Sequence, residues 1–139
     1  MNKYVKMCGK AKEIQEEWKP LVRDVVCLFF KESITFIKDK IFFKRYLVWG
    51  YPYPLCKEDM IWLPTQNQLQ EMLAPYFTDI FSMIVGFGNW CDGTYSLEVS
   101  KSYVRQFATM EELWLALLMW ERYKKIWDDE KEKWVEKEV

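Results

Sequence analysis

A run of eight consecutive apolar residues at positions 113–120 constrains the fold more than any other stretch of the chain. It lies within residues 109–127, which begin with a capping box. The Thr109 hydroxyl can accept the backbone N–H of Glu112, whose carboxylate can cap Thr109 in return. A helix that is apolar on every side has to be covered all round. The pattern therefore predicts a central helix over residues 110–127, with a sheet on one side and helices on the other.

The segment 22–49 is rich in β-branched and aromatic residues, which favour strands. Two charged pairs, Lys31-Glu32 and Asp39-Lys40, interrupt it. Breaks of two residues suggest consecutive hairpins, although neither break contains the expected glycine. We expect a small antiparallel sheet of about three strands over residues 23–49. Residues 22–30 could instead continue a helix that has Pro20 in its first turn. A strand is the preferred interpretation because good helix formers are scarce there.

Two shorter helices are predicted from the spacing of apolar residues. Residues 10–18 carry apolar side chains at intervals of three and four, and Pro20 ends this helix because proline pushes the preceding residue out of the helical region. Residues 66–74 follow a second capping box, formed by Thr65 and Gln68.

A further helix is predicted over residues 76–86. Its apolar side chains have the spacing of a buried helix face, at Phe77, Ile80, Phe81, Ile84 and Val85. The glycine-containing segment 86–93 is expected to end it. Residues 60–63 are expected to form a short edge strand, and residues 94–107 could be a strand, a loop or a lid.

These elements predict an α+β protein in which a small antiparallel sheet, about three strands over residues 23–49, packs on three or four helices (10–18, 66–74, 76–86 and 110–127). With 139 residues, the chain is expected to form one compact domain, 1–139. Residues 128–139 alternate in charge and are expected to be a solvated tail, with Trp134 as the one large anchor.

The absence of histidine excludes Ser–His–Asp and Cys–His catalysis and every metal site that uses histidine. The four cysteines have no CxxC spacing, and Cys8 is the only one in a terminus expected to be exposed. We therefore predict no catalytic residues, no metal, no cofactor and no enzyme activity. No apolar run approaches the roughly 18 residues that span a membrane. A cytoplasmic protein with reduced thiols is expected.

Aromatic residues make up 18% of the chain, and aromatic side chains suit protein interfaces. A tryptophan-rich core in a small domain is one explanation, and a partner-binding surface is the other. The candidate partner-binding residues are Tyr123, Trp127, Trp134 and Trp90. A homodimer is a further alternative, because aromatic-rich faces also form contacts between identical copies.

A second candidate surface is a basic and aromatic cluster of the kind that stacks single-stranded bases. Its members are Lys38, Lys40, Lys44, Arg45, Phe42 and Tyr46. The net charge of −1 argues against a dedicated nucleic-acid-binding protein. Nucleic acid is therefore the alternative partner, and protein the leading one.

Two segments resemble a group of small uncharacterised proteins of bacteriophages and prophages. The first is a WLPxQxQLQ segment at residues 62–70, and the second is an LWLAxxM segment at residues 113–119. Glu13-Ile14-Gln15 and Trp18-Lys19-Pro20 add to the resemblance. It implies a phage-type accessory protein in the bacterial host cell. Such proteins commonly bind host or phage proteins, so the expected function is to modulate or inhibit a host complex, including a defence complex.

Overall fold

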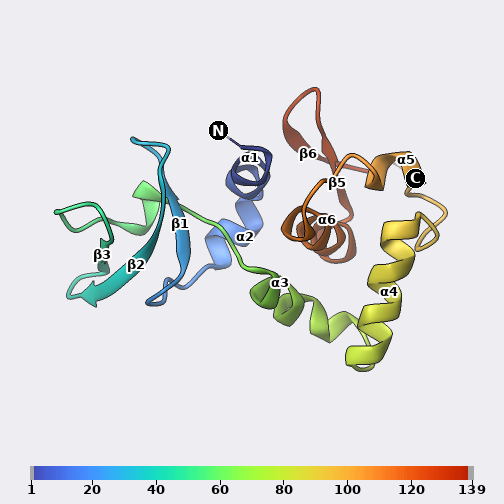
Figure 1. Ribbon diagram of the computed structural model, residues 1–139, viewed down its shortest axis with the longest axis horizontal. Coiled ribbons are helices and arrows are strands. Elements are labelled where there is room, and N and C mark those ends of the chain that lie inside the picture. The colour runs from blue at the N-terminus through green and yellow to red at the C-terminus, as the bar shows by residue number, and fades with distance from the viewer. Residues whose placement is uncertain (1, 138–139) are drawn as a thin grey trace. The chain divides into compact units, whose positions relative to one another are not determined.

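The computed structural model describes residues 2–137, which form six α-helices, a four-stranded antiparallel sheet and a two-stranded sheet (Figure 1). The predicted α+β class is confirmed. The chain divides into two compact units, Met1–Pro64 and Thr65–Val139. The single domain stays a prediction, and each unit is described by itself. None of the helices in the described part of the chain has the length and apolar character that crossing a bilayer requires.

The first unit begins with two short helices, α1 (Lys3–Lys10) and α2 (Lys12–Glu17), where one helix over 10–18 was predicted. The side chain of Asn2 caps α1 by accepting the N–H of Val5. Helix α1 continues through Gly9, where a Cβ atom would lie 3.2 Å from the Ile61 side chain. Helix α1 packs on β4 (Met60–Trp62) as well as on its neighbour α2.

The sheet of this unit contains β1 (Val25–Leu28), β2 (Ile34–Ile41), β3 (Arg45–Val48) and β4 (Met60–Trp62), in the order β3-β2-β1-β4. The strand interpretation of 22–30 and the edge strand at 60–63 are confirmed. The predicted break at Asp39-Lys40 is wrong, because both residues lie within β2 and pair with β3. The chain reverses at residues 42–44 instead. A short 3-10 helix, η1 (Lys57–Asp59), leads into β4.

The outer edge of β4 is closed by one side chain, that of Gln15 from α2. Its amide oxygen accepts the backbone N–H of Trp62 at 2.8 Å, and its amide nitrogen donates to the Trp62 carbonyl at 2.9 Å. The same nitrogen donates to the Cys8 carbonyl at 3.1 Å. The Trp18 ring stacks on the Trp62 ring with centroids 5.8 Å apart. The Tyr4 hydroxyl donates to the Pro64 carbonyl, so α1, α2 and β4 form one junction.

The second unit starts with α3 (Gln66–Leu73), confirmed with its Thr65–Gln68 capping box. A 3-10 turn, η2 (Ala74–Tyr76), then leads to α4 (Ile80–Asp92), which starts and ends later than the predicted 76–86 helix. A capping box of Asp79 and Ser82 sets its start. The helix passes through Gly86, where a Cβ atom would lie 2.6 Å from the Phe77 ring, and ends at Gly93 in a left-handed conformation.

The predicted helix over 110–127 is α6 (Met110–Tyr123), preceded by a four-residue helix, α5 (Lys101–Val104), in the ambiguous segment 94–107. Lys124 adopts a left-handed conformation that ends α6. The predicted solvated tail at 128–139 is wrong where the structure describes it. Strands β5 (Lys125–Asp128) and β6 (Lys133–Glu136) form a hairpin, because Trp127 and Trp134 pack edge to face with centroids 5.3 Å apart. Residues 138–139 of that prediction lie outside the described part.

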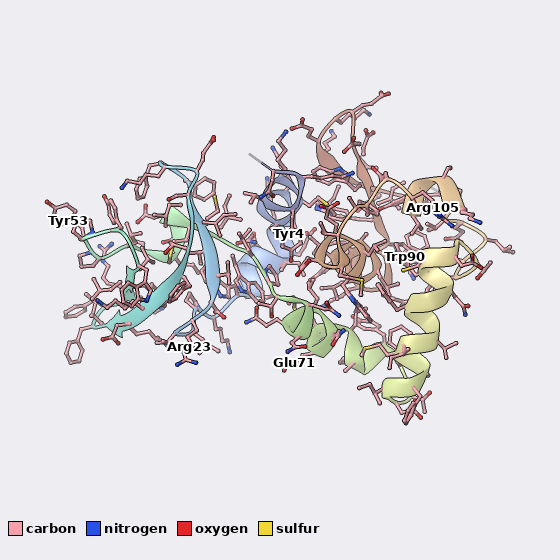
Figure 2. The ribbon with its side chains drawn as sticks, in the orientation of Figure 1. Tyr4, Arg23, Tyr53, Glu71, Trp90 and Arg105 are labelled. Carbon is pink, nitrogen blue, oxygen red and sulfur yellow. The ribbon has the colours of Figure 1, made fainter. Side chains whose placement is uncertain are left out.

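Helix α6 is the core of the second unit. Every residue from 114 to 120 is buried, as the apolar run predicts. Both α3 and α4 contact it, and the Phe87 ring of α4 stacks on Trp114 at a centroid distance of 3.7 Å. The labelled Trp90 lies between α4 and α6 (Figure 2). The helical part of the predicted covering is confirmed, and the sheet part stays a prediction.

We predict that Gln15→Leu lowers the free energy of unfolding by about 2–4 kcal/mol, because the Trp62 N–H and carbonyl lose the Gln15 amide in a half-buried site and the Cys8 carbonyl keeps only the N–H of Ala11. Urea unfolding measures it. Gln15→Glu keeps the acceptor and loses the donor, so its free energy of unfolding should lie between those of the unchanged protein and Gln15→Leu. The neighbouring exposed Glu16→Leu is the matched control. A Gln15→Leu variant as stable as this control would contradict the role assigned to the amide.

We predict a loss of stability above pH 10 that depends on Tyr103, whose hydroxyl accepts the N–H of Trp127 at 2.9 Å. Burial raises the pKa of Tyr103, and the hydrogen bond from Trp127 offsets only part of the rise. The neutral form is favoured in the fold, so its stabilisation is complete below about pH 10 and falls as pH rises further. Tyr103→Phe should cost about 1–3 kcal/mol at pH 7 and make the alkaline loss shallower.

Thermal unfolding of both proteins from pH 7 to 11.5 tests this. Part of the alkaline loss should persist in the variant, because burial and the hydrogen bond to Glu121 also raise the pKa of Tyr95. Identical alkaline slopes for the two proteins would contradict the prediction.

Candidate binding surfaces

Three of the four predicted partner-binding residues are buried, which corrects their assignment to a surface. Trp90 is fully buried, with ring edges against Tyr95 and Tyr103. Trp127 and Trp134 are buried against each other in the β5–β6 hairpin. Only Tyr123, at the end of α6, is half-exposed. The large area of an indole ring is used here for packing within the second unit.

The exposed apolar surface of the second unit lies instead on α4. Ile80, Phe81, Ile84 and Val85 occupy adjacent turns of this helix and are 61%, 74%, 56% and 62% exposed. The prediction that they face the core is wrong. The buried positions of α4 are Met83, Gly86 and Trp90. The segment is apolar on both faces, so spacing alone does not indicate which face is covered.

The surroundings of this α4 face are acidic. No Lys or Arg occurs between Lys57 and Lys101, whereas residues 65–100 contain Glu71, Asp79, Asp92 and Glu98. A hollow of about 470 Å³ adjoins the face between α3 and α4. Apolar atoms of Ala74, Phe77, Ile80 and Met83 line it, together with the carboxylates of Glu71 and Asp79. Figure 2 labels Glu71 on α3. An apolar surface with an anionic rim results.

The predicted nucleic-acid-binding residues do not share one face. A bulge between Ile37 and Asp39 separates Lys38 from Lys40. Lys38 lies with its ammonium 4.7 Å from the centre of the exposed Trp49 ring, in a hollow that also includes Arg23 and Phe36. Tyr46 is buried, contrary to its expected role on a surface, because its backbone pairs with Leu55 and its side chain packs inward. Lys40, Lys44, Arg45 and Phe42 are exposed as expected.

Several of these residues line a second hollow, which we call the basic cleft, with a volume of about 620 Å³. The segment 18–20, the β2–β3 hairpin and the segment 56–58 surround it. The side chains in its lining that are charged at neutral pH are five bases and one carboxylate: Lys19, Lys40, Lys44, Arg45, Lys57 and Glu58. Aromatic rings of Trp18, Phe43 and Tyr46 complete the lining. Sequence reasoning missed Lys19 and Lys57, which the fold brings to the hairpin from distant segments.

The tip of the β2–β3 hairpin has a strained backbone. Phe43 and Lys44 have φ angles of 65° and 57°, in the left-handed region that favours glycine and asparagine. The Phe43 side chain is 94% exposed. A large exposed aromatic residue in this conformation neither suits the turn nor contributes to a core. The stability of the fold therefore does not explain why phenylalanine occupies position 43.

Three of the four thiols lie in surroundings that disfavour the reactive form. All four cysteines are free, and Cys8 is buried, although its terminus was expected to be exposed. Burial raises the pKa of the Cys8, Cys27 and Cys91 thiols, which disfavours the reactive thiolate form. Within residues 2–137, no group of three or more His, Cys, Asp or Glu side chains could hold a metal ion.

Comparisons with protein-family models, with curated proteins and with solved structures give no match for this chain.

We predict that Phe43→Asn raises the free energy of unfolding by about 1 kcal/mol, because asparagine tolerates the left-handed conformation better than phenylalanine. Phe42→Asn is the matched control, since Phe42 is 86% exposed but has no positive φ. The control should not be stabilised. Urea unfolding midpoints measure both. A Phe43→Asn variant less stable than the control would show that the ring supports the hairpin.

Proposed function

We propose that this chain is a non-enzymatic accessory protein that acts by binding another protein through the apolar face of α4. One observation carries the proposal: four large apolar side chains on adjacent turns of one helix are each more than half exposed. Contiguous exposed apolar patches of this kind mark interaction sites. The spacing of Ile80, Phe81, Ile84 and Val85 is that of a helix that packs lengthwise against a partner.

Charge specifies the chemistry of the partner. Glu71 and Asp79 lie at the rim of the α4 face, and no Lys or Arg is among the residues that line the adjoining hollow. A partner with an apolar helix or ridge bordered by Lys or Arg would complement both the patch and its rim. A symmetric contact between two copies of this face would bring carboxylates together, which costs binding free energy. We therefore propose a partner other than the same face of a second copy.

In the phage setting that the sequence resemblance implies, such binding would modulate or inhibit a host complex. The geometry supports the binding step of this proposal. The choice of a host protein over a phage protein depends on the resemblance alone.

We predict that a helical peptide with a leucine face and a lysine rim binds the protein, and that its glutamate-rimmed counterpart does not. The double variant Phe81→Glu, Ile84→Glu should weaken binding by at least about 2 kcal/mol, because it charges the centre of the patch. These changes also make the surface more acidic. A contact that is only electrostatic would therefore become tighter, so the sign of the change separates the two explanations.

Isothermal titration calorimetry measures the affinities. Ile41→Glu with Phe42→Glu, at exposed apolar positions of the first unit, is the matched control and should leave binding unchanged. Equal or tighter peptide binding by the α4 double variant would overturn the proposal. A photo-crosslinking residue at position 81, compared with one at the fully exposed Leu97, identifies the partner in bacterial cells. Crosslinks only between copies of this chain would replace the proposal with self-association.

A further inference from the structure

The two units carry opposite net charges, which the total of −1 conceals. The first unit, Met1–Pro64, contains 12 Lys or Arg and 8 Asp or Glu, a net charge of +4. The second, Thr65–Val139, contains 8 Lys or Arg and 13 Asp or Glu, a net charge of −5. The low overall charge therefore does not exclude a polyanion as ligand of the first unit.

The basic cleft concentrates this positive charge at one place. Five of the six side chains in its lining that are charged at neutral pH are bases. The Lys57 ammonium donates to the Glu16 carbonyl at 3.0 Å, and the Arg45 guanidinium contacts the Cys56 sulfur, so protein atoms orient both. The ammonium groups of Lys19, Lys40 and Lys44 have no hydrogen-bond or ion-pair partner among the described residues. These three are free to receive an anion.

The cleft also offers aromatic surface beside the charges. The Phe43 ring is almost fully exposed at the hairpin tip, on the same rim as Lys44. Its left-handed backbone is unfavourable for phenylalanine, so the ring is present at a cost to the fold. Ammonium groups next to an exposed ring are the combination that binds phosphates and stacks an unpaired base. The volume of about 620 Å³ lies within the range of small-ligand sites.

We infer that the basic cleft binds single-stranded nucleic acid, with phosphates at Lys19, Lys40 and Lys44 and a base stacked on Phe43. A hollow admits an unstacked base, whereas a duplex keeps its bases stacked and out of reach. Lys19, on the 18–20 segment, and Phe43, at the hairpin tip, line the same hollow, so a ligand that enters the hollow can contact both. This site lies in a different unit from the α4 face and does not depend on the proposed protein partner.

Fluorescence anisotropy with labelled 15-mers of deoxythymidine and uridine tests the inference. We expect binding at 50 mM salt that weakens as salt increases. Lys40→Gln with Lys44→Gln should remove two phosphate contacts and reduce the slope of log K against log salt by about 1.4. Lys131→Gln with Lys133→Gln removes the same charge from exposed positions of the second unit and is the matched control. It should leave the slope unchanged.

The stacking contact has its own variant. Phe43→Asn should weaken binding by at least about five-fold, the loss of one stacked base, while its unfolding midpoint does not fall. Reduced affinity in a protein that is at least as stable cannot come from misfolding. Lys19→Gln, on a separate segment, should also weaken binding, which distinguishes the cleft from the hairpin alone.

Three results would overturn the inference. These are no binding of either oligomer at 50 mM salt, equal salt slopes for the Lys40, Lys44 variant and its control, and binding of duplex in preference to single strands. Binding to vesicles with 30% anionic lipid is measured as well, to compare a lipid surface with the oligomers. Vesicle binding that depends on Phe43, without oligomer binding, would assign the tip to a lipid surface instead.

Discussion

The first unit depends on the hydrogen bonds of one amide side chain. A sheet edge presents backbone groups that need partners, and at β4 the Gln15 amide supplies both a donor and an acceptor to Trp62. It thereby holds α2 against the sheet and places Trp18 over the Trp62 ring. The Trp18 indole in turn donates to the buried Asp24 carboxylate at 2.8 Å. Helix, edge strand and the start of β1 are therefore fixed by a single connected set of polar and aromatic contacts.

This junction gives a structural account of residues on which the phage resemblance depends. Gln15, Trp18, Trp62 and Pro64 all belong to it, through the amide, the stacked rings and the hydrogen bond from Tyr4. The contacts of these residues hold the first unit together. Trp18 also lines the basic cleft, next to Lys19 of the same segment, whereas the apolar face of α4 consists of other residues. The residues of the resemblance therefore serve the fold and also contribute to one of the two candidate surfaces.

Local signals in the sequence were enough for much of the fold. The capping box at Thr65, the Thr109 cap and the apolar run at 113–120 act within a few residues, and the helices α3 and α6 that they predict are present. The Thr109 hydroxyl accepts the Glu112 N–H as predicted, but the Glu112 carboxylate accepts the N–H of Ala108 rather than that of Thr109. The errors arise where distant residues decide. Gly86 is helical because it packs on Phe77, and the chain after Lys124 forms a hairpin because two tryptophans pair across it. The candidate surfaces were the least predictable. Ile80 and Phe81 are exposed because no other element of the second unit covers them, and the spacing of apolar residues in the sequence does not indicate which helix face is covered.

The burial of the tryptophans makes the protein its own spectroscopic reporter. Seven of the eight are buried, and Trp49, on the sheet beside Lys38, is 52% exposed. A collisional quencher in solution would therefore reach one indole preferentially. The quenchable part of the intrinsic emission belongs to the outer surface of the sheet, and the protected part to the two cores. Binding of a ligand to that surface would change the quenchable fraction of the tryptophan emission, and unfolding of either core would change the protected fraction.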